Sequence, residues 1–545
     1  MKRHLRILGP LLLLFLSGQP KGYAEESCGL RHFGGDSYVC VCNSTFCDEL
    51  PIITPVRAGI YLAFQSTLNG HRFAVSEGSF TSWEGEKAGK ESADEVDVTY
   101  TVGPAAGQQL ILGFGGALTD AAAINILSLS QANQRSLLSS YFSPSGLEYN
   151  MMRIPMAGCD FSTHIYSYDE VEGDFELQHF NLTSEDLNMK IPLIHRIQRM
   201  TKTPLKILAS PWSAPGWMKT NKAMSGGGKL IGQAGDRYHK SWAQYFVKFV
   251  QHYQVHNISI WGLTAQNEPI DGFIPLFPFQ SMGFSPTSQR DFISTDLGPA
   301  LSNAGLRKVK LIIMDDQRFL LPKWADTVLA DNATSRYVDG IGVHWYFNYI
   351  TPASVLSKTR QRHPDKFLLS TEACEGSMPW QTKVVLGDWS RAEAYATDIM
   401  ENLLNGVGGW IDWNLALDTQ GGPNWASNFV DSPIIVNAKA DEFYKQPMFY
   451  ALGHFSKFIS AGSYMVQGES VLTPHVMTIL TLGLASHPAK SLLICTAERP
   501  DKGLALVVLN KSSTTLHLRI VDGRRVRGSF VAQIAPRSIS SFIWW

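Results

Sequence analysis

The feature that most constrains this chain is a series of eight short apolar segments between residues 109 and 414, separated by polar, helix-like stretches. The segments are ILGFGGALT, YNMMRIPMAG, PLKILASPW, SIWGLTAQNE, KLIIMDD, VDGIGVHWYF, KFLLSTEA and GGWIDWNL. Intervening stretches such as SQANQRSLLSSYF and DRYHKSWAQYFVKFVQHYQ carry apolar residues at the i, i+3, i+4 spacing of amphipathic helices. Eight strands alternating with helices predict a (β/α)8 barrel within an α/β fold. A doubly wound sheet is the alternative that periodicity alone leaves open.

The two flanks of this region have a different pattern. Residues 61–108 and 463–545 contain short alternating runs bounded by turn residues, which predict an accessory antiparallel β-sandwich built from both ends of the chain. We assign residues 25–60 with 415–446 to a small β subdomain that contains two disulfides. Residues 447–462 are assigned to the catalytic barrel together with 109–414.

The first 24 residues, MKRHLRILGPLLLLFLSGQPKGYA, are typical of a secretory signal peptide. They combine a basic start with a Leu-rich run that is too short to span a bilayer. We expect cleavage after Ala24 and entry into the secretory pathway.

Seven cysteines are consistent with that route. Cys159, Cys374 and Cys495 are scattered, and we expect them to be free, buried thiols. The other four cluster near the mature N-terminus, where a C-x-C-x4-C run would suit zinc in a cytosolic chain and disulfides in a secreted one. Four cysteines allow three pairings. The predicted pairing joins nearest neighbours, Cys28–Cys40 and Cys42–Cys47.

Five N-x-[ST] sequons behind a signal peptide predict a glycosylated protein. They begin at Asn43, Asn181, Asn257, Asn332 and Asn510. The sequon at Asn257 is the least secure, because it adjoins a predicted buried strand.

The charge of the chain depends on pH. The leader carries four basic residues and no acidic one, so its removal changes the net charge from −1 to −5. Protonation of the 14 remaining histidines sets an upper limit of +9, which would favour an anionic membrane surface in an acidic compartment. Buried histidines would not contribute to this change. The sequence has no basic run or motif that indicates nucleic-acid binding.

Several familiar motifs are absent from the sequence. The segment SGGGKLIGQAGD (225–236) lacks the glycine spacing of a phosphate loop, and GFGGAL misses the dinucleotide-binding pattern. Neither H-E-x-x-H nor G-x-S-x-G occurs, which argues against zinc proteases and α/β-hydrolases.

Chemistry in a (β/α)8 barrel is built at the carboxyl ends of its strands. The residues at these predicted ends are Asp120, Arg153, Asp160, Trp212, Asn267, Glu268, Asp315, Asp316, His344, Trp345, Tyr346, Glu372, Trp413 and Asn414. Glu268 and Glu372 end strands four and seven, and paired carboxyl groups are what glycoside hydrolysis needs. Tryptophans at the same mouth would suit the C–H face of a sugar ring. This mixture of aromatic and polar groups predicts a glycosidase better than either glutamate alone.

Simpler interpretations exist for each of these residues. A single Glu at a strand end is more often solvated or ion-paired than catalytic. The indoles of Trp212, Trp345 and Trp413 would also fit ordinary barrel packing. Arg153 would then serve only to hold a neighbouring carboxylate ionised and in place.

Longer motifs resemble those of the glucosylceramide-cleaving β-glucosidases of glycoside hydrolase family 30. The motifs are MAGCDFS, LASPWSAPGWMKTN, TAQNEP, STEAC and DWNLALDTQGGPNW. The resemblance covers essentially the whole mature chain. It implies that Glu268 is the acid/base and Glu372 the nucleophile, whereas Glu375 lies past the strand end.

The same resemblance implies roles for further residues. Sugar contacts fall on Asp160, Trp212, Asn267, Trp413 and Asn428. Supporting groups around the nucleophile fall on Arg153, His344 and Tyr346. The implied mechanism retains anomeric configuration through a covalent glucosyl-enzyme and needs no metal or organic cofactor. Because Glu268 must donate a proton, we expect burial and the charge of Glu372 to raise its pKa.

One position departs from the family pattern, which has Glu two residues before the acid/base where this chain has Gln266. Strand alternation would place Gln266 on the same side as Glu268. We therefore expect the pH–rate profile to have a lower upper pKa than that of a Gln266→Glu variant.

The resemblance also implies a lysosomal protein that associates peripherally with membranes containing glucosylceramide. Its implied partners are anionic phospholipids, a saposin-type activator and a lysosomal sorting receptor. The loop FIPLFPFQSMGF (273–284), with Phe347 and Trp380, would form an apolar rim for lipid chains, or else pack internally. Two further functions stay open: a β-xylosidase or endoglucanase of the same family, and a catalytically silent glycolipid-binding protein.

Overall fold

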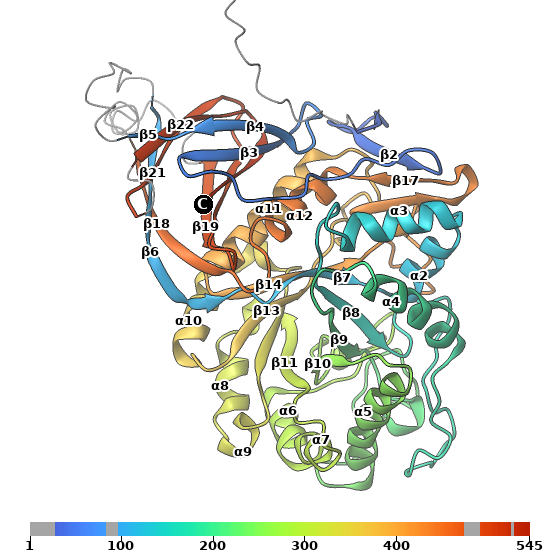
Figure 1. Cartoon of the computed structure of the whole chain (residues 1–545). Helices are drawn as coiled ribbons and strands as arrows, with labels where there is room; N and C mark the ends of the chain where they lie inside the picture. Colours follow the sequence, from blue (N-terminus) through green and yellow to red (C-terminus); the bar gives the residue numbers. More distant parts are fainter. Residues whose placement is uncertain (1–27, 83–95, 473–490, 525–527) are drawn as a thin grey trace, which may run out of the picture.

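The computed structural model describes residues 28–82, 96–472, 491–524 and 528–545 (Figure 1). The predicted signal peptide and its cleavage site lie outside the described residues. Figure 1 shows a barrel with helices around it and, beside it, a separate layer of strands, most of which pair antiparallel, with β21 (Leu516–Asp522) and β6 (Val98–Leu110) as a parallel pair.

Eight parallel strands close into a barrel in chain order, which confirms the (β/α)8 prediction over the doubly wound alternative. The strands are β7 (Gly113–Ala117), β8 (Met151–Met156), β9 (Lys206–Pro211), β10 (Ile260–Thr264), β11 (Lys310–Gln317), β12 (Gly340–His344), β13 (Phe367–Glu372) and β14 (Val407–Asn414). The barrel closes between β14 and β7, where Trp410 pairs with Phe114. Buried apolar side chains on five of the strands form one cluster, so the barrel is filled and is not a pore.

Helices connect successive strands. They are α2 (Asp120–Leu127), α3 (Gln131–Phe142), α4 (Ile191–Gln198), α5 (Arg237–Val255), α6 (Pro286–Phe292), α7 (Gly298–Asn303), α8 (Lys323–Leu329), α9 (Asn332–Ser335), α10 (Ser354–Arg362) and α11 (Trp389–Leu404), with α12 (Pro447–Ser456) after the barrel. Side-chain N-caps explain where two of these helices, α3 and α5, begin. Ser130 accepts a hydrogen bond from the backbone of Asn133, and Asp236 accepts from Tyr238 and His239.

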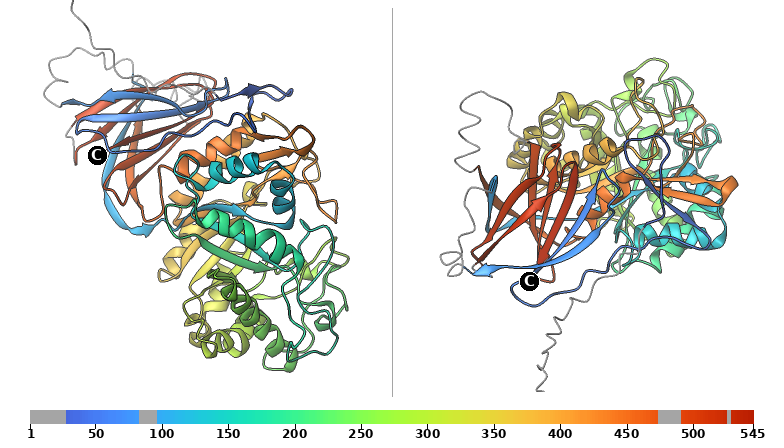
Figure 2. Two further views of the ribbon diagram at one scale, coloured as in Figure 1. Left: turned by 45° about the vertical axis from the view of Figure 1, so that its right-hand side comes forward. Right: turned by 90° about the horizontal axis from the view of Figure 1, so that it is seen from above.

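Two further sheets flank the barrel. The smaller contains β1 (Leu30–Arg31), β2 (Val39–Asn43), β15 (Leu417–Asp418), β16 (Ile434–Asn437) and β17 (Glu442–Lys445). The larger has ten strands within the described residues: β3 (Ile60–Thr67), β4 (Ala74–Ser79), β5 (Thr81–Ser82), β6 (Val98–Leu110), β18 (Tyr464–Leu472), β19 (Leu492–Glu498), β20 (Leu504–Asn510), β21 (Leu516–Asp522), β22 (Gly528–Ile534) and β23 (Ser538–Trp544). This larger sheet contacts α11 and α12, and Figure 2 shows its position beside the barrel from two further sides.

The structure pairs the N-terminal cysteines as predicted, Cys28 with Cys40 and Cys42 with Cys47. The remaining three cysteines are free and buried. Within the described residues, no helix combines the length and apolar character needed to cross a membrane.

Burial in the folded chain bears on two expectations from the sequence. Asn510 is fully buried, and its amide nitrogen donates to the backbone carbonyls of Thr514, Ile534 and Ala535, so the folded chain offers no glycan acceptor there. The upper charge limit of +9 is not reached, because burial lowers the pKa of His454 to about 3. The asparagines of the sequons at 181, 257 and 332 are exposed.

Candidate active site

The two glutamates predicted to be catalytic lie together at the carboxyl ends of the barrel strands. Glu372 is the last residue of β13, as predicted. Glu268 does not end its strand: β10 stops at Thr264, and Glu268 follows four residues later with a φ of 39°. Its backbone N–H donates to Asp315 at 2.9 Å, which fixes this strained position against β11. The nearest carboxylate oxygens of the two glutamates lie within 4.8 Å of one another.

Arg153 holds Glu372 from inside the barrel. Its guanidinium forms ion pairs with Glu372 and, at 2.8 Å, with Asp315, and its side chain is fully buried. The same guanidinium donates to Asn267 Oδ1 at 2.8 Å. The Tyr346 hydroxyl donates to the other carboxylate oxygen of Glu372 at 2.6 Å. Glu372 is therefore oriented on both oxygens.

His344, the last residue of β12, bridges the carboxylates of Glu268 and Asp315. Its Nδ1 lies 2.9 Å from Glu268 Oε1, and its Nε2 lies 3.1 Å from Asp315 Oδ1. Burial alone would lower the pKa of His344, but the charges of Glu372 and Asp315 and these two hydrogen bonds raise it to about 10. The ring is therefore an imidazolium that donates from both nitrogens at neutral pH.

This cation changes the expected protonation of Glu268. Burial acts to raise the pKa of Glu268, but the hydrogen bond and positive charge of His344 bring it below its usual value. Burial raises the pKa of Glu372 instead. The prediction that the pKa of Glu268 is raised is therefore wrong for this structure, since the sequence did not show that His344 binds it.

Apart from Asn267, which is bound by Arg153, the predicted sugar-binding residues fall into two groups. Asp160 Oδ2 accepts hydrogen bonds from Asn428 at 3.0 Å and from Asn424 at 3.2 Å, and burial raises the pKa of Asp160 to about 7. Trp212 and Trp413 stack on each other, with ring centroids 5.1 Å apart and Arg153 within 5.4 Å of both. The two indoles are thus packed as the simpler interpretation expected, and their sugar contacts stay a prediction.

Three further polar residues surround Glu268. Gln317 Nε2 donates to Glu268 Oε1 at 2.8 Å. Gln317 is the last residue of β11, so it could have been identified in the sequence as a residue at the carboxyl end of a barrel strand. Asp316 is fully buried beside it and accepts from the backbone N–H of Ile270 at 3.1 Å. Asp271 follows Glu268 in the loop, where no pattern in the sequence indicated a role.

Gln266 faces backbone carbonyls. Its Nε2 donates to Pro211, Trp212 and Asn267 at 2.9–3.1 Å. Because β10 ends at Thr264, strand alternation does not extend to this residue.

A carboxyl group at position 266 would meet the same three carbonyl oxygens and would stay protonated. We now expect Gln266→Glu to leave the upper pKa of the pH–rate profile unchanged. It should lower the free energy of unfolding by about 1–3 kcal/mol, because a carboxylic acid has one donor where the amide has two. Urea denaturation and a pH–rate profile of both proteins test this. If the pH–rate profile of Gln266→Glu had a higher upper pKa than that of the wild type, the original interpretation would hold, in which Gln266 deprives Glu268 of a neighbouring negative charge.

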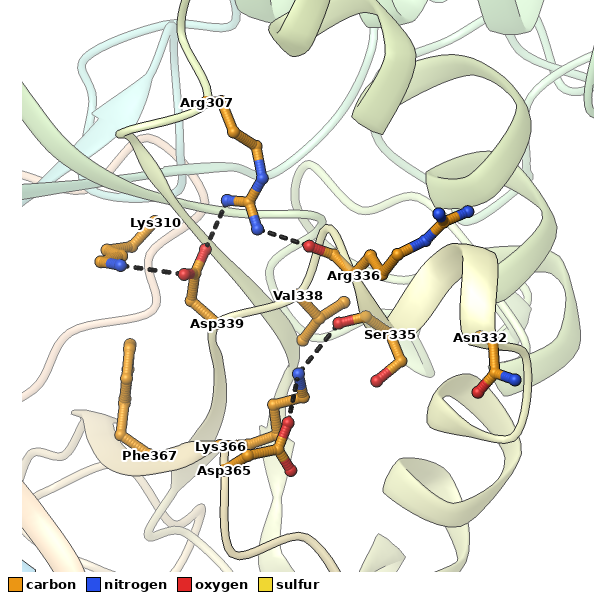
Figure 3. Close-up of a pocket in the computed structure, with 10 residues that line it drawn as sticks. All are labelled: Arg307, Lys310, Asn332, Ser335, Arg336, Val338, Asp339, Asp365, Lys366 and Phe367. Carbon is orange, nitrogen blue, oxygen red and sulfur yellow. Dashed lines mark hydrogen bonds and ion pairs between the residues drawn. The ribbon is translucent and has the colours of Figure 1, made fainter.

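The opposite end of the barrel carries a cavity of about 790 Å³ (Figure 3). It is lined by residues at the starts of β11 and β13 and just before β12, and Figure 3 shows Arg307 and Lys310 directed at Asp339. Asn332, the first residue of a predicted sequon, also lines it. Because its lining includes the first residues of β11 and β13, the cavity lies at the opposite end of the barrel from the carboxylate pair, where active sites of such barrels are not found.

Comparison with known proteins identifies the family of the chain. Residues 111–459 match the glycosyl hydrolase family 30 TIM-barrel domain, and residues 482–542 match the family's beta sandwich domain. The chain is 44% identical over 524 residues to the lysosomal acid glucosylceramidase of Mus musculus, with 96% of each chain covered. It is 45% identical over 526 residues to putative glucosylceramidase 3 of Caenorhabditis elegans, again with 96% of each covered.

Among solved structures, SrfJ from Salmonella typhimurium aligns with a TM-score of 0.76 and 27% sequence identity, covering 89% of this chain and 99% of SrfJ. Both domains of the family are thus present, and the barrel match alone extends over more than half of the sequence. The chain therefore belongs to glycoside hydrolase family 30 and is a glycosidase.

Proposed function

We propose that this enzyme is a lysosomal, retaining β-glucosidase that hydrolyses glucosylceramide to glucose and ceramide. The observation that carries the retaining mechanism is the separation of Glu268 and Glu372, whose nearest oxygens lie within 4.8 Å. Retaining glycosidases keep their carboxyl groups about 5 Å apart, whereas inverting enzymes need about 6.5–9.5 Å to admit a water. The orientation of Glu372 by Arg153 and Tyr346 supports its role as nucleophile.

The reaction has two steps. In the first, Glu372 forms a bond to the anomeric carbon while the bond to the ceramide oxygen breaks, and that oxygen receives a proton from Glu268. In the second, water gives its proton to Glu268 and its oxygen to the anomeric carbon, and the bond to Glu372 breaks. Configuration is inverted twice and so retained. Asn267, held by Arg153, and Asp160, held by Asn428, are the proposed hydroxyl-binding groups.

A membrane glycolipid as substrate is supported by exposed apolar residues beyond the same strand ends. Leu276, 89% exposed, and Trp380, 73% exposed, follow β10 and β13. Tyr349 and Ile350 follow β12 and are also exposed. A cavity of about 500 Å³ lined partly by Trp345 and Tyr346 reaches the residue that binds Glu372. Binding of a polysaccharide would not require these exposed apolar residues at the mouth of the site, which we call the apolar rim.

The membrane partners remain part of the proposal. The apolar rim would insert at the surface of a bilayer that contains anionic phospholipids, with a saposin-type activator presenting the glycolipid. Delivery to the lysosome would require a sorting receptor. The glucosylceramidase names of the two relatives support the substrate class.

A mechanism-based β-glucoside inactivator tests the catalytic assignment. At a pH of about 5 it should form a covalent adduct on the peptide that contains Glu372. A stable adduct elsewhere, or none on folded protein, would refute the mechanism. A silent glycolipid-binding protein would give no adduct and yet retain binding.

Substrate class needs a second assay. Rates on glucosylceramide in anionic vesicles, on a soluble β-xyloside and on a soluble β-glucan should favour the vesicles. Faster hydrolysis of the β-xyloside or the β-glucan would assign the enzyme to another activity of the family.

A further inference from the structure

We infer that Asp271 shares the acid/base proton with Glu268, so that the two carboxyl groups act as one proton-holding pair. The inference deepens the reaction proposed above and rests on it. Asp271 is then a positioning residue, because it acts through Glu268 and is not required to touch the substrate.

The loop geometry places the two carboxyl groups together. Asp271 opens the short helix η4 (Asp271–Phe273), and its backbone N–H donates to the carbonyl of Glu268 at 3.0 Å. Their side chains are joined by a hydrogen bond. Two ionised carboxylates have no donor between them, so this contact requires one proton on the pair.

The surroundings determine which carboxyl group carries the proton. Glu268 Oε1 accepts from His344 at 2.9 Å and from Gln317 at 2.8 Å, which favours its ionised form. Asp271 forms no ion pair in the part of the chain that the structure describes, and it faces Glu268 and the fully buried Asp316. The His344 imidazolium is the cation that acts on it, through its charge alone.

The pKa values follow this arrangement. Burial and the negative charges of Glu268 and Asp316 raise the pKa of Asp271 to about 10. Burial and the charge of Glu268 raise the pKa of Asp316 to about 8. Glu268, bound by His344, has its pKa lowered. In the free enzyme the proton therefore resides on Asp271, one hydrogen bond from the residue that must deliver it.

This pair reconciles an acid catalyst with a lowered pKa. In the first step, one proton leaves the pair through Glu268 for the departing oxygen, and both carboxylates are then ionised. Their mutual repulsion makes Glu268 a stronger base for the water of the second step, which returns one proton to the pair. The pair also keeps its proton to a higher pH than Glu268 would alone.

Asp271→Asn tests the inference through the pH dependence of kcat/KM on a soluble β-glucoside. Without the second carboxyl group, Glu268 loses its proton at lower pH, so the basic limb should move down by about one pH unit or more. The acidic limb should stay in place. Asp271→Glu, which retains a carboxyl group, should restore the basic limb, and Glu172→Gln, an exposed acidic site, is the matched control.

A basic limb in Asp271→Asn that matches the wild type, with only kcat reduced, would show a purely structural role and overturn the inference. Infrared difference spectra at pH 7 provide a readout that does not depend on activity. A carboxylic-acid band lost in Asp271→Asn supports the shared proton, and an unchanged band contradicts it. Absence of β-glucosidase activity in the wild type would instead refute the proposed function, and the infrared result would still decide this one.

Discussion

Replacing Glu372 with glutamine is expected to reduce kcat for β-glucoside hydrolysis by about 10⁴-fold or more. The amide is nearly isosteric, and Tyr346 can still donate to its oxygen, so the binding site should persist. Only the nucleophile is lost, because a neutral amide forms no stable bond to the anomeric carbon. A loss of this size corresponds to about 5.5 kcal/mol of transition-state stabilisation. Steady-state kinetics on a soluble β-glucoside provide the measurement.

Glu375→Gln is the matched control for this variant. Glu375 lies three residues later, is also buried, and accepts a hydrogen bond from Gln381 at 2.9 Å without a contact to Glu268. It should keep most of the wild-type rate. Azide added to a Glu372→Gly variant should restore turnover of a substrate with a good leaving group and yield the inverted glucosyl azide. Comparable losses in both Gln variants would point to damage of the loop and against Glu372 as nucleophile.

The barrel could be predicted because its strands are encoded locally. Each parallel strand is buried on both faces and so appears in the sequence as a continuous apolar run such as KLIIMDD, which becomes β11. Strand ends were predicted less well. The polar segment after Thr264 leaves the barrel wall, and Glu268 reaches the site from a left-handed backbone conformation that no alternation rule describes.

The contacts around the catalytic pair depend on packing between distant segments. Arg153 pairs with Glu372 on another strand, and His344 on β12 binds Glu268 in the loop after β10. Residue charge and the predicted order of the strands therefore identified candidate residues but not which of them contact one another. Asp271 was missed because its role depends on the path of one loop. Asn510 shows the converse case, since a local sequon motif carries no information on the strand packing that buries this residue.

Arg153→Met is expected to lower the free energy of unfolding by about 3–5 kcal/mol at pH 7. The guanidinium is fully buried, forms ion pairs with Asp315 and Glu372, and donates to Asn267 and Ser210. Methionine fills much of the volume but leaves two buried carboxylates without this cation. Urea denaturation of the wild type and the variant measures the difference.

The pH dependence of this loss identifies its electrostatic part. Burial alone would raise the pKa of Asp315, but Arg153 and His344 hold it well below its usual range. A carboxyl group with a depressed pKa contributes stability above its unfolded value of about 3.9, and this contribution is lost as the pH falls. Without Arg153, the pKa values of Asp315 and Glu372 rise. The loss of unfolding free energy in the variant, relative to the wild type, should therefore be largest at pH 7 and smaller near pH 4.

Two further proteins separate charge from packing. Arg153→Lys keeps a cation but not the planar fork, and should lose less stability than the Met variant. In the Glu372→Gln background, Arg153→Met should lower the free energy of unfolding by less than in the wild type. One of the two carboxylates that would lose their cation is already replaced by a neutral amide. Equal losses in both backgrounds and at both pH values would assign the effect to packing against Trp212 and Trp413, on which the guanidinium rests.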